Sequence, residues 1–332
     1  MPEIRIDPLS GHRTIIAGDR SRRPGGEPGC SAPEPIDSER DPFAPGHEDR
    51  TPPELYAVRP GSEQPDTGGW TVRVVPNLYP ALTGAGEDDH KEQVVQRDAR
   101  SELFSSLPAS GSHEVIINGP QSVLSLAELP AEQVAAAMDV WRERMRVHGA
   151  SPYVQLIVNE RREAGASLPH THAQLYAFDF VPAMVARERE RFGSYATRTM
   201  GQNLLEDLVA EEVRMRERIV AIDDEAVLIA PYASCLPFQL MLVPRTPRAR
   251  FEDDGPTGAA LLHDGLTRLA RHLGSSPPLN MWVRTAPLGA EHFCWRIDVM
   301  PRLTHLAGLE LSSGVNLNIV APEHAAALLR EA

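Results

Sequence analysis

The sequence has few cysteines and no long apolar run, and both absences exclude classes of protein. Its three cysteines, Cys30, Cys235 and Cys294, are widely separated among 332 residues, which leaves neither a disulfide framework nor a CxxC metal motif. No apolar stretch approaches the roughly 20 residues that a membrane-spanning helix needs. The start, MPEIRIDPLSG, lacks the basic and then apolar layout of a signal peptide. We therefore expect a cytoplasmic protein that does not bind membranes.

Positive charge is also in short supply, with 33 Lys and Arg against 46 Asp and Glu. Nucleic acids and anionic membranes both attract proteins with a positive field, so this composition argues against nucleic acid as a partner. A local basic pocket for a small phosphorylated molecule is compatible with it. The length suits one large domain or two ordinary ones, with ample core in either case.

Two parts of the chain show the same order of predicted elements. In the first part, a strand at 113–120 precedes a helix at 129–149, and strands follow at 153–160 and 170–180. After a further helix at 203–219, the second part has strands within 226–245, a helix at 258–274, and strands at 279–287 and 292–302. The pattern predicts a divergent duplication of one α+β unit. We expect residues 1–195 to form the first unit and residues 196–332 the second.

The segment GASLPHTHAQLYA contains two histidines and a glutamine at alternate positions. Successive side chains of a strand face opposite ways, so His170, His172 and Gln174 are expected to share one face. Three interpretations of this face are open: a polar piece of sheet, a metal site, or the edge of an active site.

The loop before these histidines carries Asn159, Gly165 and Ser167, whose backbone and side-chain donors can reach phosphate oxygens. Together they give N-x5-G-x-S-x2-H-x-H-x-Q, which resembles the active-site segment of galactose-1-phosphate uridylyltransferases, in the histidine-triad superfamily. That family commonly has proline where this chain has Thr171. Other segments resemble the family in the same order: DPLSGHRTIIAGDRSRRP, DPFAPGHEDRTPPE, VPNLYPAL, SGSHEVIINGP and PRLTHLAGLELSSGVNLNIVAPEHAAALLR.

The resemblance implies an α+β fold of tandem histidine-triad-like repeats, each an antiparallel sheet with packed helices. It also implies a nucleotidyltransferase that moves UMP between a UDP-hexose and a hexose 1-phosphate. His172 would form a covalent uridylyl–His172 intermediate, because neutral imidazole attacks phosphorus well and leaves well once protonated. Gln174 would donate hydrogen bonds to the phosphate but cannot deliver a proton at neutral pH. This favours phosphate-type acceptors over the hydrolysis of amides.

The resemblance assigns further substrate contacts. Arg20 and Arg23 match paired phosphate-binding arginines, and Asn77 matches a residue beside the nucleotide. Glu310 and Asn316 are candidates for binding sugar hydroxyls, in a C-terminal segment that in this family reaches the neighbouring subunit's site. We therefore expect a homodimer whose small-molecule partners are a nucleotide sugar and a sugar 1-phosphate.

Family members often hold a structural zinc ion between two cysteines and two histidines. Here the cysteine positions are Asp41 and Ala44, while His113 and His170 remain. Carboxylate oxygen is an acceptable zinc ligand, so the implied Zn²⁺ site is Asp41, His113 and His170, with His47 as a substitute ligand. The loss of both thiolates weakens such a site. Without metal, His113 and Asp41 would hydrogen-bond in its place.

The second unit departs from the family as well. It has Cys294 and Arg296 where relatives often have histidines, so a second metal and a second nucleophile are not expected there. Two other functions stay open: an ADP-sugar phosphorylase of the same superfamily, which passes the nucleotide to phosphate, and a nucleotide-binding relative without catalysis. A purely structural role for the histidines does not account for the loop before them.

Overall fold

The computed structural model describes residues 2–18, 20, 29–61, 64–84, 96–97 and 103–332. Arg23, one of the predicted phosphate ligands, lies outside these residues. Within the described parts of the chain, no helix is long and apolar enough to cross a membrane.

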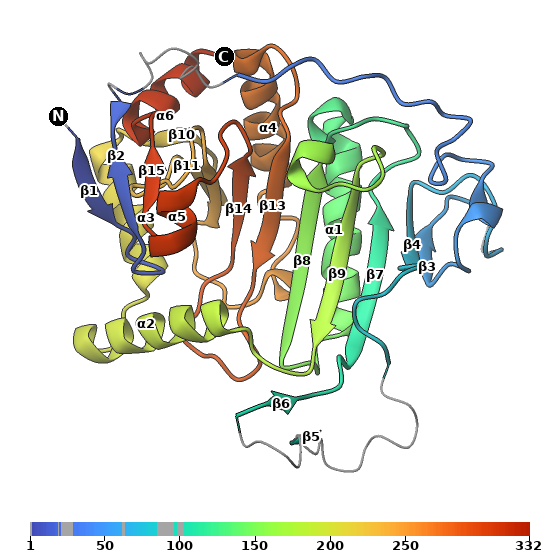
Figure 1. Cartoon of the computed structure of the whole chain (residues 1–332), viewed down its shortest axis with the longest axis horizontal. Helices are drawn as coiled ribbons and strands as arrows, with labels where there is room; N and C mark the ends of the chain where they lie inside the picture. Colours follow the sequence, from blue (N-terminus) through green and yellow to red (C-terminus); the bar gives the residue numbers. More distant parts are fainter. Residues whose placement is uncertain (1, 19, 21–28, 62–63, 85–95, 98–102) are drawn as a thin grey trace.

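One antiparallel sheet of ten strands runs through the molecule, in the order β10-β11-β12-β14-β13-β8-β9-β7-β4-β3 (Figure 1). The strands are β3 (Tyr56–Val58), β4 (Val72–Pro76), β7 (Gly111–Ile117), β8 (Tyr153–Glu160), β9 (His172–Phe178), β10 (Ile219–Ile222), β11 (Ala226–Ile229), β12 (Leu240–Pro244), β13 (Leu279–Arg284) and β14 (Arg296–Pro301). The first five strands along the chain and the last five have the same topology. In each set, the fifth strand in chain order lies in the sheet between the third and the fourth. β8 pairs with β13 and joins the two sets. This repeated arrangement confirms the predicted α+β fold of tandem units.

Helices cover one face of the sheet. α1 (Ala131–Val147) and α4 (Ala259–Leu273) each connect the third and fourth strands of their unit, and α6 (Pro322–Glu331) packs beside α4. In α1 the fully buried Val134, Met138, Trp141 and Met145 recur at helical spacing and form one apolar stripe. This stripe joins a core that continues through both units, so the two repeats are stabilised together.

The opposite face is covered over the second unit by α2 (Ala183–Thr199) and α3 (Leu204–Met215). There Leu9, Phe192 and Leu205 pack with Met241 and Val243 of β12. A three-stranded sheet of β1 (Glu3–Ile6), β2 (Arg13–Ile16) and β15 (Asn316–Asn318) flanks this layer, together with α5 (Gly308–Ser313) (Figure 1). β5 (Gln96–Arg97) and β6 (Ser105–Ser106) pair as a separate two-stranded sheet. Over the first unit the corresponding face carries a cleft.

Some element predictions were wrong in detail. The helix expected at 203–219 ends at Met215, and β10 begins at Ile219, because the β-branched residues there gain a ladder partner in β11. α2 was not predicted, since few apolar residues mark its buried side. The division that we expect after residue 195 stays a prediction; residue 195 itself lies within α2. β9 begins at His172, so His170 precedes the strand instead of sharing its face.

Candidate active site

A cleft of about 550 Å³ opens on the face of the first unit that the helices leave free. Its walls come from β4, β7, β9 and the segment 42–52. The lining residues are Pro42, Phe43, Arg50, Thr51, Pro52, Val75, Pro76, Asn77, Leu78, Tyr79, His113, Val115, Ser167, Leu168, His172 and Gln174. Apolar and aromatic side chains form most of the wall, and a few polar groups converge on it, as is usual for sites that bind small molecules.

His172, the first residue of β9, lies in the wall of this cleft and is 6% exposed. Its Nδ1 is 2.7 Å from the carbonyl oxygen of His170, and because a carbonyl only accepts, Nδ1 carries the hydrogen. The lone pair is therefore on Nε2. Burial lowers the pKa of His172 below its ordinary value, which keeps the ring neutral. The ring of Phe43 packs edge-on at 5.3 Å between centroids and fixes its orientation.

Gln174 lies two residues further along the strand and also lines the cleft. Its Oε1 accepts from His113 Nε2 at 3.0 Å and from the Tyr176 hydroxyl at 3.0 Å. The backbone N–H of Ala81 donates to His113 Nδ1 at 3.1 Å, so the hydrogen of His113 is on Nε2. Burial lowers the pKa of His113, consistent with a neutral ring. With its oxygen engaged, Gln174 has its amide N–H groups to offer to a ligand.

The predicted loop residues do not all reach the cleft. Ser167 lines it. Gly165 ends a short 3₁₀ helix at φ 92°, in the left-handed region that favours glycine, and so turns the chain toward Ser167. Asn159 lies on β8, where its Oδ1 accepts from Asn280 at 2.8 Å. Asn77 is in the wall, and its Nδ2 is 3.1 Å from His113 Nε2; with a hydrogen on each nitrogen, this contact is not a hydrogen bond.

His170 and Asp41 form a fully buried pair behind the cleft, with Nδ1 and Oδ2 2.7 Å apart. The other nitrogen, Nε2, is 2.8 Å from the carbonyl of Gly119. The carbonyl only accepts, so Nε2 carries a hydrogen, and Nδ1 shares a hydrogen bond with the Asp41 carboxyl group. Burial works against the Asp41 carboxylate, but hydrogen bonds from His170, Ser122 and the N–H of Phe43 outweigh it and hold its pKa below the usual range.

As they lie, the three residues expected to bind zinc do not fit the ion. His113 faces Gln174, and both nitrogens of His170 are hydrogen-bonded. His47 bonds through Nδ1 to the backbone carbonyl of Asp41, not to its carboxylate. Within the described residues no three His, Cys, Asp or Glu side chains converge as a metal site. The expectation of zinc stays a prediction, and metal binding would require these side chains to rotate.

In the second unit, an ion cluster occupies the face that corresponds to the cleft. Arg296 contacts both carboxylate oxygens of Glu188 at 3.1 Å and Asp298 Oδ2 at 3.0 Å. All three side chains are buried. Cys294 lies beside them in the apolar layer, and burial raises the pKa of its thiol to about 12. This packing supports a structural role for the second unit.

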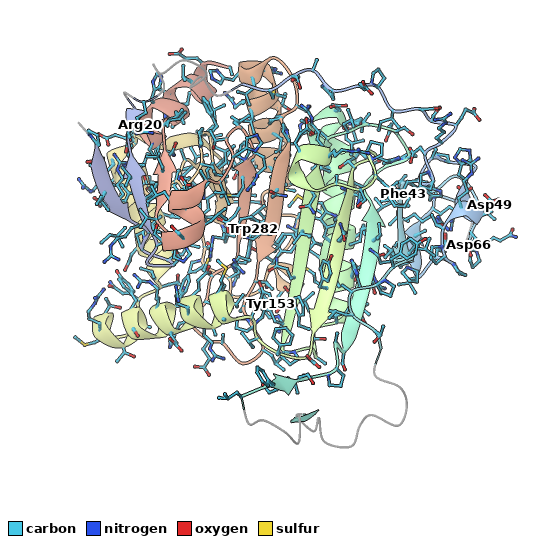
Figure 2. All side chains as sticks on the ribbon, in the orientation of Figure 1. Arg20, Phe43, Asp49, Asp66, Tyr153 and Trp282 are labelled. Carbon is cyan, nitrogen blue, oxygen red and sulfur yellow. The ribbon has the colours of Figure 1, made fainter. Side chains whose placement is uncertain are left out.

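Three predicted substrate residues lie away from His172 within one chain. Figure 2 shows Arg20 on the side of the molecule formed by the second unit, far from Phe43, which marks the cleft in the first. Glu310 is in α5, where it accepts from the N–H of Ala307. Asn316 is in β15 and lines a separate, smaller cavity.

Sequence patterns did not identify several residues of the cleft. Phe43 and Arg50 come from the Pro-rich segment, where no periodicity marks them, although both line the cleft. Tyr176 continues the alternation of His172 and Gln174 and could have been found from it. Its ring stacks on that of His113 at 4.0 Å between centroids.

Tandem histidine-triad-like units, with His172 and Gln174 of an HxHxQ segment in one cleft, define the class of the protein as a nucleotidyltransferase of the histidine-triad superfamily. The chain belongs to the galactose-1-phosphate uridyl transferase family, since residues 2–182 match the model of that family's N-terminal domain.

Individual relatives match nearly the whole chain. An ADP-glucose phosphorylase from Arabidopsis thaliana is 27% identical over 347 residues, covering 99% of this chain and 93% of the relative. A galactose-1-phosphate uridylyltransferase from Cryptococcus neoformans is 27% identical over 355 residues, covering 98% and 89%. The crystal structure of an Arabidopsis thaliana ADP-glucose phosphorylase with bound ADP-glucose superposes with a TM-score of 0.80 at 25% identity, covering 100% of this chain and 99% of the other.

Proposed function

We propose that the protein transfers a nucleoside monophosphate from a nucleotide sugar to a phosphate-type acceptor through a covalent nucleotidyl–His172 intermediate. The observation that carries the proposal is the state of His172: a buried, neutral ring in the wall of a cleft, with Nδ1 bound to the His170 carbonyl. That arrangement leaves the lone pair of Nε2 for phosphorus.

In the first step, Nε2 of His172 attacks the α-phosphorus and the bond to the sugar 1-phosphate oxygen breaks. That oxygen takes the electron pair, and the sugar 1-phosphate leaves. The positive charge on the ring is shared through Nδ1–H with the His170 carbonyl. In the second step, an acceptor phosphate oxygen attacks the same phosphorus, the P–N bond breaks, and the pair returns to Nε2. One difficult displacement thus becomes two easier ones.

Gln174 stabilises the phosphoryl group in this scheme. Its oxygen is bound by His113 and Tyr176, so the amide N–H groups donate to the oxygens on which charge develops. An amide cannot protonate a leaving group at neutral pH. A sugar 1-phosphate needs no proton to leave, whereas an amine does, so Gln174 supports transfer between phosphates.

The substrate pair we favour is a UDP-hexose with a hexose 1-phosphate, as in the galactose-1-phosphate uridylyltransferase relative. ADP-glucose with inorganic phosphate is the second candidate, supported by the ADP-glucose phosphorylase relative and the similar structure with bound ADP-glucose. Separate incubations with UDP-glucose and ADP-glucose, without acceptor, distinguish them by the mass that the protein gains. A gain of UMP supports the first pair and a gain of AMP the second.

A nucleotide-binding relative without catalysis is the remaining alternative, and the replaced cysteine positions, Asp41 and Ala44, favour it. It predicts tight binding of nucleotide sugar, no mass gain, and binding that His172→Asn leaves unchanged. Release of labelled glucose 1-phosphate in a single turnover would exclude it.

A shared site in a homodimer is part of the proposal. Arg20 is exposed on the side of the second unit, where no phosphate ligand of the same chain's His172 would lie. A two-fold dimer brings the same pair of surfaces together twice, so each chain could complete its partner's cleft with Arg20 and α5.

A further inference from the structure

The carbonyl that orients His172 belongs to the peptide link between His170 and Thr171. The N–H of the same link, on Thr171, donates to the Val123 carbonyl at 2.8 Å. A peptide unit is planar and rigid, so holding its N–H also fixes the direction of its C=O. The direction of that C=O in turn determines which nitrogen of His172 carries the hydrogen.

The side chain of Thr171 provides a second anchor. It is 1% exposed, and its hydroxyl accepts from Asn118 Nδ2 at 3.3 Å and donates to Glu160 Oε1 at 3.3 Å. Asn118 is itself fully buried and accepts from the indole N–H of Trp141 at 3.0 Å. The hydroxyl therefore ties the link to the core beneath α1.

Glu160 connects this anchor to two further elements. It is the last residue of β8, and its carboxylate accepts from the Ser125 hydroxyl at 2.6 Å and from the Leu126 N–H at 2.7 Å. Ser125 caps the 3₁₀ helix η3 (Leu126–Glu128). Thr171 is thus held from β8, from η3 and from the end of β7, and not from the cleft.

We propose that Thr171, acting with Glu160 and Asn118, is the positioning residue that sets the tautomer and ring orientation of His172. The inference rests on the proposed function, because it assigns His172 as the nucleophile. A proline at this position, as the family pattern commonly has, would supply neither the N–H nor the hydroxyl. In this chain the threonine performs the positioning through both groups.

Three variants test the proposal. Thr171→Val keeps the shape and the backbone N–H but removes the hydroxyl, whereas Thr171→Ser keeps the hydroxyl. Thr285→Val is the matched control, because Thr285 is also 1% exposed, accepts from the Phe251 N–H at 3.0 Å and donates to the buried Glu252 at 2.8 Å in the second unit. It should lower the melting temperature about as much as Thr171→Val without affecting the cleft.

The first measurement is the pair of ¹⁵N ring shifts of His172 in the full-length protein, assigned by their absence from His172→Asn. We expect hydrogen on Nδ1 in wild type, in Thr171→Ser and in Thr285→Val, and a mixture of tautomers in Thr171→Val. The second is the rate of adduct formation from nucleotide sugar. This rate should fall about tenfold or more in Thr171→Val and stay within about threefold of wild type in Thr171→Ser. The Kd for the free mononucleotide should be nearly unchanged in both variants.

Wild-type ring shifts together with a wild-type rate in Thr171→Val would overturn the positioning role. A fall in the rate that Thr285→Val reproduces would also overturn it, because general destabilisation then explains the effect. If wild type forms no adduct with UDP-glucose or ADP-glucose, the proposed function fails, while the ring shifts still decide whether Thr171 sets the state of His172.

Discussion

His113 Nε2 donates to Gln174 Oε1 across β7 and β9, with the two atoms 3.0 Å apart. The sequence predicted these residues for different roles, one as a zinc ligand and the other in catalysis. In the structure they form one unit, in which the ring determines the direction of the amide. The amide then presents hydrogens, not oxygen, toward a phosphate.

His113→Phe tests this unit. Phenylalanine keeps the stack on Tyr176 but cannot donate to Gln174, so the amide is free to turn its oxygen toward the phosphate. We expect adduct formation to slow about tenfold or more, with little change in mononucleotide affinity, as measured by single-turnover kinetics. Tyr176→Phe, which removes the other donor to the same oxygen, should have a smaller effect of the same kind. A wild-type rate in both variants would contradict this role.

Asp41→Asn removes the carboxylate that accepts hydrogen bonds from His170, Ser122 and the Phe43 N–H in the core. Because breaking a buried pair is costly, the free energy of unfolding should fall by about 3 kcal/mol, measured by urea titration at pH 7. Glu211→Gln is the control: its pair with Arg214 is exposed, so no measurable loss is expected. An unchanged stability in Asp41→Asn would contradict this role of the buried pair.

The zinc prediction can be tested on the same preparations. Stoichiometric zinc in wild type, lost in Asp41→Asn, would show that His113 and His170 rotate to bind metal. Full stability of wild type in the presence of a chelator is the result that the hydrogen bonds of His170 predict.

Glu160 gives a pH dependence with a defined sign. Burial raises its pKa from 4.5 to about 7. Between these values the unfolded chain loses the proton and the folded chain keeps it, so this group's contribution to stability is full below about pH 4.5 and is lost as the pH rises through about 7. Glu160→Gln retains an oxygen for Thr171 and should therefore be more stable than wild type at pH 8, by up to about 3 kcal/mol, with the difference vanishing near pH 4.

Glu114 provides a control, because its pKa is shifted in the opposite direction to that of Glu160. Burial opposes its charge, but His148 and Arg144 outweigh burial and lower its pKa. Its contribution to stability is therefore present at neutral pH and is lost in acid, so Glu114→Gln should destabilise the protein at pH 7 and less so at low pH. The same trend with pH in both variants would contradict these assignments.

Mixed dimers test whether Arg20 acts in a partner's cleft. Arg20→Ala and His172→Asn should each be nearly inactive alone. After the two are unfolded together and refolded, half of the dimers contain one of each chain, and each has one intact site. Activity should return to about a quarter of the wild-type value by symmetry. No recovery, or full activity of Arg20→Ala alone, would exclude a shared site.

Local patterns predicted much of the fold. The strand 153–160 matches β8, and the core of the helix 129–149 matches α1, because both have strong periodicity. The alternation of His172 and Gln174 also holds on β9. It fails at His170, where the strand has not yet begun and the ring instead meets Asp41, 129 positions away along the chain.

Contacts of that range carry no local signal, which is why the pairing of His113 with Gln174 could not be predicted either. Arg50 was missed for a different reason: its guanidinium bonds to the Glu39 carbonyl only 11 positions away, but no periodicity marks the Pro-rich segment that carries both residues. The family resemblance named histidines that the structure places in the wall of the cleft or behind it, but the partners of each ring depend on the folded arrangement.

The most direct test of the central claim is intact-protein mass spectrometry after incubation with a nucleotide sugar and no acceptor, followed by mapping of the modified peptide. We predict a gain of one nucleoside monophosphate on His172, which disappears when a sugar 1-phosphate or inorganic phosphate is added and is absent from His172→Asn. Sustained turnover by His172→Asn, or an adduct on another residue, would contradict the account.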